Sequence, residues 1–166
     1  MPEKDIVFNG KVKHDGVFNF KDFYDFMYFW FLDEEYDLVE KSYSESVSGD
    51  SKNLKIAWEA DKKVSDYFKF RIKVSWVISA MKSIETQRDG KKVKANSGIL
   101  ELRIQALLVK DYEGRWENKA VWKFLRGVYD RYIIRSRIEE YEIKLFEEVS
   151  NLIDQCKAYL ELESKK

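Results

Sequence analysis

Apolar side chains occupy every second position over a long central stretch of the chain. They are Phe68, Phe70, Ile72, Val74, Trp76, Ile78 and Ala80, and the polar residues Lys69, Arg71, Lys73 and Ser75 lie between them. Successive side chains of a strand point to opposite faces, so this alternation predicts one long strand with a single apolar face. The same even-numbered pattern returns at Leu100, Leu102, Ile104, Ala106 and Leu108. Asp89-Gly90, between the two runs, is a favoured two-residue hairpin turn.

The register of this hairpin predicts an irregularity. If a regular strand ladder continued outwards from a two-residue turn at Asp89-Gly90, even-numbered positions of one strand would face odd-numbered positions of the other. Facing residues must share a side of the sheet, because otherwise one apolar set would face water. One extra residue in the return strand restores the match, so we expect a β-bulge near Asn96–Gly98. The pairs expected with this bulge are Trp76 with Ile104 and Ile78 with Leu102.

The N-terminal part predicts a strand followed by a helix. Ile6, Phe8 and Val12 alternate with polar residues, which indicates a strand over roughly 5–14 that ends in a turn at Asp15-Gly16. Asn19 precedes an apolar run and can accept a hydrogen bond from a free N–H at a helix start. We therefore expect a helix over about 20–32.

Two further strands and a long helical region complete the pattern. The strands are expected at 36–47 and Leu54–Ala60, with a turn at Ser48-Gly49-Asp50 between them. Helical periodicity runs from Asn118 to about Leu162. Its apolar stripe changes phase near Ile134–Arg137, which predicts a kink, a change of packing partner or two separate helices.

Length and composition place these elements in one domain, residues 1–166. The chain has 166 residues, of which 45% are hydrophobic and 16% aromatic, enough to bury a sizeable core. The element order predicts an α+β fold. A curved antiparallel sheet would carry an N-terminal aromatic helix, with a long C-terminal helix packed on the sheet.

This order resembles the helix-grip layout of the START-like, polyketide-cyclase-like superfamily. The resemblance covers most of the chain, rests on topology alone and has no diagnostic motif. It implies a hydrophobic cavity between the sheet and the last helix for a lipid or another apolar small molecule. Bulky inward residues such as Phe68 would instead fill that space. The candidate ligand-binding residues between sheet and helix are Phe70, Trp76, Ile104, Phe124 and Val128.

Charge and cysteine content limit the classes of partner and compartment. Thirty basic and thirty acidic residues cancel, which makes nucleic acid an unlikely partner for the whole chain. A single cysteine, Cys156, cannot form an intramolecular disulfide and suits a reducing cytoplasm. The N-terminus lacks a signal-peptide pattern, and the most apolar run, Phe26–Leu32, is far shorter than the ~20 residues of a membrane span. We expect a cytoplasmic protein.

No catalytic or metal-binding constellation is visible in the sequence. His14 is the only histidine, and one His with one Cys cannot make a tetrahedral zinc site. The acidic run Asp33-Glu34-Glu35 lacks the ligand spacing of a calcium loop. No glycine-rich phosphate loop occurs, and no cofactor is expected. An enzyme is therefore unsupported.

The predicted first helix is aromatic around nearly all of its circumference. An ordinary surface helix shows one apolar stripe. Two interpretations remain open: both sides of the helix are buried within the fold, or one side contacts a partner or ligand. Phe26 and Phe29 are the candidate contact residues here.

The predicted C-terminal helix has oppositely charged halves. Residues 118–137 carry six basic side chains against one acidic, and residues 138–163 carry eight acidic against two basic. Two such helices laid antiparallel would match basic to acidic halves, an arrangement that a C2 homodimer gives. A solvated charged face is the simpler and favoured interpretation. The candidate interaction residues are Arg131, Arg135, Glu140 and Glu147. A weaker hypothesis is nucleic-acid binding through Lys69, Arg71, Lys73 and the basic half.

Overall fold

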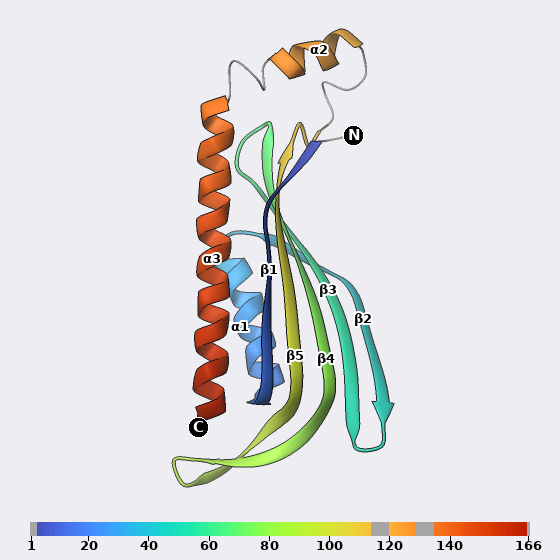
Figure 1. Ribbon diagram of the computed structural model, residues 1–166, viewed down its shortest axis with the longest axis vertical. Helices are drawn as coiled ribbons and strands as arrows, with labels where there is room; N and C mark the ends of the chain where they lie inside the picture. Colours follow the sequence, from blue (N-terminus) through green and yellow to red (C-terminus); the bar gives the residue numbers. More distant parts are fainter. Residues whose placement is uncertain (1–2, 114–119, 129–134, 166) are drawn as a thin grey trace.

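The computed structural model describes residues 3–113, 120–128 and 135–165, and its centre is an open five-stranded antiparallel sheet with the strand order β1-β5-β4-β3-β2 (Figure 1). The strands are β1 (Glu3–Phe18), β2 (Asp37–Ser48), β3 (Ser51–Lys63), β4 (Phe68–Arg88) and β5 (Lys91–Lys110). The helices are α1 (Phe20–Asp33), α2 (Ala120–Val128) and α3 (Arg135–Lys165). The expected α+β class is confirmed.

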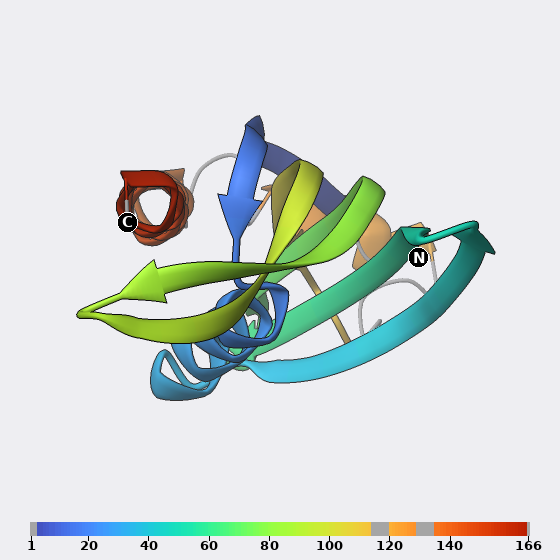
Figure 2. The same cartoon turned by 90° about the horizontal axis from the view of Figure 1, so that it is seen from below.

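The sheet is curved, and two helices cover its concave face. α3 lies along β1 and β5, whereas α1 lies between α3 and β2 (Figures 1 and 2). This arrangement is compatible with a helix-grip-like description. None of the helices in the described part of the chain is both long enough and apolar enough to cross a membrane.

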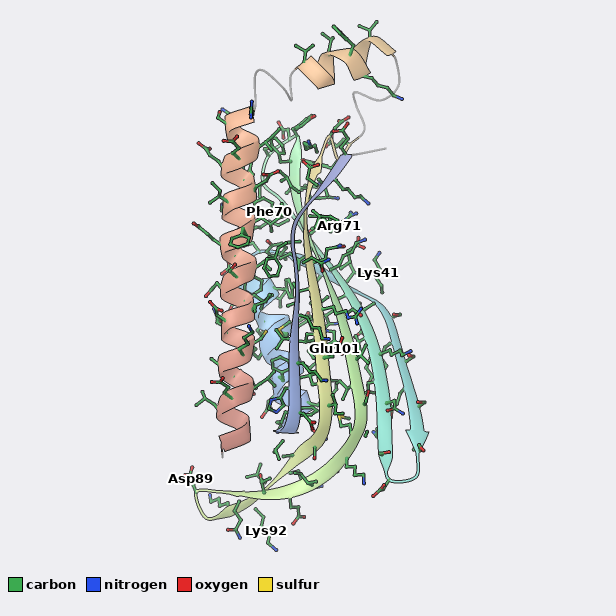
Figure 3. All side chains as sticks on the ribbon, viewed as in Figure 1. Lys41, Phe70, Arg71, Asp89, Lys92 and Glu101 are labelled. Carbon is green, nitrogen blue, oxygen red and sulfur yellow. The ribbon has the colours of Figure 1, made fainter. Side chains whose placement is uncertain are left out.

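The even-numbered apolar positions form the core, as the alternation predicts. From Phe68 to Ile78 each of them is at most 3% exposed, and from Leu100 to Leu108 each is fully buried. The odd positions between them project from the convex face. Figure 3 shows this for two neighbours, because Phe70 points towards α3 and Arg71 points away from it. The convex face is consequently mostly polar, although Leu107 of β5, at an odd position, is apolar and buried.

The hairpin turn at Asp89-Gly90 is confirmed, but the bulge lies in the other strand. β4 has one extra residue there, because Ala80 and Met81 together lie opposite Gly98 of β5. The pairing of β4 with β3 shifts at the same place. Trp76 therefore faces Leu102, and Ile78 faces Leu100, rather than Ile104 and Leu102 as expected. An extra residue in either strand restores the pairing of even with even positions. The sequence pattern therefore predicts where the bulge lies but not which strand contains it.

Close backbone packing explains the glycine at position 98. A Cβ there would lie 2.9 Å from the carbonyl oxygen of Ser79 and 3.0 Å from Cα of Met81. On the other side of the bulge, the side chain of Asn53 accepts a hydrogen bond from the Ala80 N–H at 3.0 Å. Ala80 has a φ of 53°, a left-handed conformation that a non-glycine residue adopts only when its surroundings hold it there.

The expected turn at Asp15-Gly16 is wrong. β1 continues through both residues to Phe18 and pairs with β5 along this whole length. Gly16 lies directly opposite Gly98 in this register. Its φ is 142°, and the strand continues through it without a chain reversal. The cross-strand partner, which local sequence cannot reveal, decides the conformation here.

The start of α1 agrees with the prediction, and its cap is tied to the sheet. The side chain of Asn19 accepts a hydrogen bond from the Asp22 N–H at 3.0 Å. The first helical N–H, that of Phe20, donates to the Asn96 side chain of β5 at 3.0 Å. Because free N–H groups at a helix start need acceptors, β5 helps to fix where α1 begins.

The C-terminal region forms two helices rather than one continuous helix. α2 ends at Val128 and α3 begins at Arg135, and residues 129–134, on which part of the expected break falls, lie outside the described residues. Figure 1 shows α2 beyond one end of the sheet and α3 along its concave face. The described parts of this region are two helices that run in different directions, and the path of the chain between them lies outside the described residues.

Gly98→Ala should destabilise the protein by about 1–3 kcal/mol, because the added methyl group meets backbone atoms that cannot rotate away. Urea unfolding followed by circular dichroism measures the change. Gly127→Ala in α2 is the matched control, because nothing lies within 4 Å of a Cβ at that position and alanine favours helix. An equal loss in both variants would contradict this explanation.

Candidate functional site

The space between the sheet and the helices brings together only part of the predicted ligand site. Phe70, Trp76 and Ile104 lie on the concave face and are fully buried. Phe124 and Val128 belong to α2, beyond the end of the sheet, and Phe124 is 70% exposed (Figure 1). The five residues therefore do not line one site, and binding of an apolar molecule there stays a prediction.

Aromatic rings occupy the region around Trp76. The ring centroids of Trp58 and Phe23 lie 5.0 Å and 5.5 Å from that of Trp76. The indole Nε1 of Trp76 is the only buried side-chain nitrogen or oxygen in the described part of the chain that lacks a hydrogen-bond partner. Surrounding ring faces are weak acceptors for such an N–H. A ligand entering here would have to displace these rings.

A polar cluster lies between β3 and α3. The Tyr36 hydroxyl donates to Glu148 Oε2 at 2.7 Å, and the Lys62 ammonium donates to Glu148 Oε1 at 2.8 Å. The ammonium also lies 4.7 Å from the centre of the Tyr36 ring. Burial, and then the negative charge of Glu148, raise the pKa of the Tyr36 hydroxyl. Through Glu148, this cluster ties α3 to β3 and to Tyr36.

Sequence reasoning missed this cluster, although a signal for it exists. Lys62 continues the even-numbered series of β3 and is therefore on the inward face. Glu148 stands three residues after Leu145 and four before Leu152, which are both buried, so it is on the same side of α3. A charge at an inward position of each element predicts that the two meet.

The aromatic side chains of α1 lie in three different environments around the helix. Phe23 and Met27 face the interior and are fully buried. Phe26 turns towards α3 and stacks on Tyr159, with ring centroids 5.0 Å apart. The third side is open to solvent: Phe29 is 56% exposed, and Tyr28 and Leu32 are exposed beside it. Burial within the fold thus explains two sides of the helix, and contact of the third side with a partner or ligand stays a prediction.

The edge strand β2 begins next to α1. Its residues are exposed except Leu38, which is half-buried. A glutamate of the strand, Glu40, accepts hydrogen bonds from the Tyr24 hydroxyl at 3.0 Å and from the Trp58 indole at 3.2 Å, which joins α1, β2 and β3. Burial, and then the bond to Glu40, raise the pKa of Tyr24 to about 12. Glu40 thus ties the first half of β2 to α1 and β3.

The predicted charged interface residues are not brought together. Arg131 lies outside the described residues. Arg135, Glu140 and Glu147 are exposed on α3, where Arg135 lies 3.7 Å from the Glu139 carboxylate. Because α2 and α3 are separate helices, the basic and acidic halves do not form the single straight helix that an antiparallel charge match requires.

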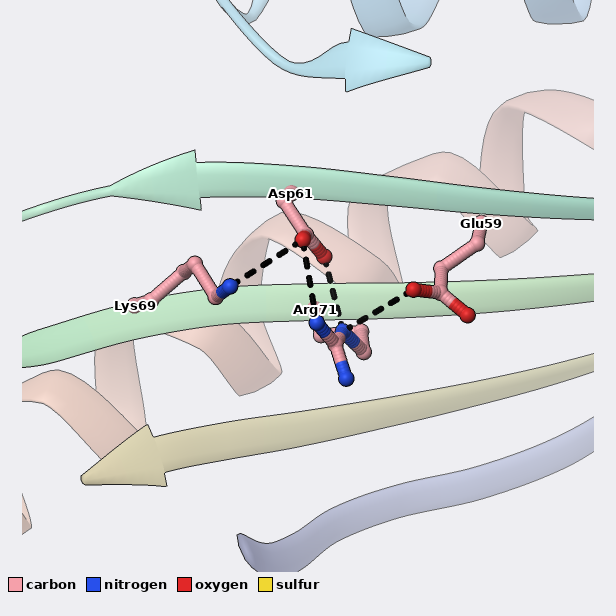
Figure 4. A network of polar contacts seen from close by, with 4 residues as sticks. All are labelled: Glu59, Asp61, Lys69 and Arg71. Carbon is pink, nitrogen blue, oxygen red and sulfur yellow. Dashed lines mark hydrogen bonds and ion pairs between the residues drawn. The ribbon is translucent and has the colours of Figure 1, made fainter. Parts of the chain in front are cut away.

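Ion pairs on the convex face use two of the cations assigned to nucleic-acid binding. Arg71 donates from Nε and Nη2 to Asp61 at 2.9 Å and 3.1 Å, and its Nε lies 3.3 Å from Glu59 (Figure 4). Lys69 lies 3.2 Å from Asp61. Burial alone would raise the pKa of Asp61, but the hydrogen bonds and charges of Arg71 and Lys69 outweigh it and lower that pKa. Lys73 makes no ion pair among the described residues.

Within the described ranges, no three His, Cys, Asp or Glu side chains are grouped so that they could hold a metal ion. His14 lies within strand β1, and its Nε2 is 2.9 Å from the Val17 carbonyl oxygen. The backbone partner gives this histidine a local structural contact.

Comparisons with known proteins give no family for this chain. No family model matches it, and neither a curated protein nor a solved structure does. The similarity to the START-like superfamily therefore stays a prediction from element order.

Glu148→Gln should lower the free energy of unfolding by about 3 kcal/mol, because it leaves the charge of Lys62, whose side chain is only 14% exposed, without a counter-charge. Adding Lys62→Met should recover part of the loss, because the unpaired charge is then removed. Urea unfolding of the two variants and the parent measures both effects. A double variant less stable than Glu148→Gln would contradict the role given to this pair.

Asp61→Asn should reduce stability at neutral pH by about 1–3 kcal/mol, because a charge-assisted bond to Arg71 is lost. The folded protein lowers the pKa of Asp61, so its stabilisation is present above the unfolded value of about 4 and disappears as the pH falls through the folded value. Unfolding midpoints of parent and variant should converge in acid. Asp66→Asn, at an exposed position, is the control and should keep a constant difference from the parent.

Proposed function

We propose that this chain is a non-catalytic interaction module that forms a symmetric homodimer through β2 and the solvent-facing side of α1. We call this the α1/β2 surface and define it as Tyr28, Phe29 and Leu32 of α1 with residues Ser42–Ser48 of β2. Two observations carry the proposal: three exposed apolar side chains on α1, and an edge strand, β2, whose second half is exposed along its whole length. Contiguous exposed apolar groups of this kind mark contact sites.

The free edge of β2 supports strand pairing with another chain. An edge strand presents a row of unpaired N–H and C=O groups, and proteins usually protect it with charges, bulges or a covering element. β2 has a bulge at Lys41, but Ser42–Ser48 continues in regular register with β3. That segment carries one charged side chain, Glu45, which lies 3.2 Å from Lys52. The usual protection is thus absent from the second half of the strand.

The same features favour a second copy as the partner. With Glu45 already neutralised by Lys52, two copies of Ser42–Ser48 can approach without strong repulsion. A C2 axis perpendicular to the sheet would pair the two β2 strands antiparallel and join the sheets edge to edge. α1 lies on the concave side near the start of β2, so this axis places the two sets of Tyr28, Phe29 and Leu32 on the same face of the joined sheet.

Combining Phe29→Lys with Val47→Lys should convert the dimer into a monomer, because each dimer would then bury four added ammonium groups at its interface. Size-exclusion chromatography with light scattering measures the mass. Ile143→Lys on α3 is the matched control, because Ile143 is 59% exposed and lies outside the α1/β2 surface. A parent protein that is monomeric at all concentrations would overturn the proposal.

Oxidative cross-linking tests the position of the axis. The native thiol, Cys156, is buried and its pKa is raised to about 12 by that burial, so it does not compete for cross-linking. Ser44→Cys should give a disulfide-linked dimer, whereas Ser136→Cys at the exposed start of α3 should not. The reverse result would place the contact on α3.

A further inference from the structure

A depression of about 370 Å³ lies on the convex face of the sheet and reaches across all five strands. Two small residues that face each other in register, Ala57 and Ser75, lie at its centre. Longer side chains surround them: Lys41, Lys73 and Arg103 are cationic, and Asn9 and Gln105 are amides. The volume falls in the range of small-molecule sites, and the hollow follows from short side chains between long ones.

The charges around this depression are unbalanced. Its lining holds three cations and one carboxylate, that of Glu59, which is itself 3.3 Å from Arg71. Neither Lys41 nor Lys73 has an ion pair within the described part of the chain. Arg103 donates from Nε to Glu101 at 2.9 Å, which leaves its other N–H groups available. Cations without counter-charges in a hollow attract an anion.

A neighbouring depression on the same face shows the contrast. It has a volume of about 210 Å³ and shares Lys41 and Glu59, but three carboxylates balance its three lysines. The carboxylate of Asp61 there is already bound to Arg71 and Lys69 (Figure 4). Equal numbers of lysines and carboxylates are typical of an ordinary solvated surface on which the charges pair with one another. The larger depression has an excess of cations instead.

We propose that the larger depression binds the phosphate groups of a small phosphorylated molecule, with Lys73, Arg103 and Lys41 as the charged contacts. Arg103 can donate two parallel hydrogen bonds to one phosphate, and the ammonium groups act as point charges. Ser75, Asn9 and Gln105 supply neutral donors beside them. Register places Gln105 between Asn9 and Lys73 in one row, with Ser75 and Arg103 opposite each other in the next, so these groups face one spot.

The test uses the full-length protein with pyrophosphate as the probe, by isothermal titration calorimetry at low salt. Lys73→Gln and Arg103→Gln should each weaken binding about tenfold or more, as expected for the loss of one charge-assisted contact. Lys144→Gln on α3 changes the net charge by the same amount as Lys73→Gln and should leave binding unchanged. Circular dichroism of each variant confirms that it is folded.

A second arm separates a small phosphorylated ligand from a nucleic-acid backbone. A single-stranded RNA oligonucleotide is titrated under the same conditions, with and without saturating pyrophosphate. Saturable pyrophosphate binding that depends on Lys73 and Arg103 supports the proposal. Binding of RNA alone, no saturable binding of pyrophosphate, or an equal loss in Lys144→Gln would each overturn it. The readout is independent of the α1/β2 surface, because Lys73 and Arg103 belong to β4 and β5.

Discussion

The rest of the structure depends on the two-residue alternation that runs along β4 and β5 and fixes which face of the sheet is apolar. Even-numbered side chains bury against α1 and α3, and odd-numbered ones project from the convex face. The bulge at Ala80 shifts both neighbouring strand pairings at one place, so the three strands bend together without exchanging their faces. Both the packed interior and the charged outer surface follow from this one constraint.

Much of the fold was predictable because it depends on the local periodicity of apolar and polar residues. The strand faces, the hairpin turn at Asp89-Gly90 and the cap at Asn19 all follow from side-chain spacing or turn chemistry. The predictions are wrong where pairing with a strand distant in the sequence determines the local conformation. The bulge belongs to Ala80 rather than to β5 because parity is satisfied by an extra residue on either side. The chain does not turn at Asp15-Gly16 because β5 offers a partner as far as Asn96.

The contact surfaces were harder to predict because they depend on which neighbours each side chain meets. The sequence showed that α1 is apolar all round, but not that Phe26 meets α3 while Phe29 meets solvent. Likewise, Lys69, Arg71 and Lys73 look equivalent in the sequence. The opposing strand separates them, because Asp61 binds the first two and leaves Lys73 unpaired among the described residues. Cross-strand register, rather than composition, therefore determines which cations remain available.

The pairing of β1 with β5 has a consequence for how the chain is made. The strand β1 (Glu3–Phe18) pairs with β5 (Lys91–Lys110) alone. Residues up to Lys110 must therefore leave the ribosome before β1 can join the sheet. Until then, the apolar side of β1 and the aromatic helix after it have no surface to cover them. Folding of such a non-local topology is slow, and the nascent chain is exposed to aggregation during that interval.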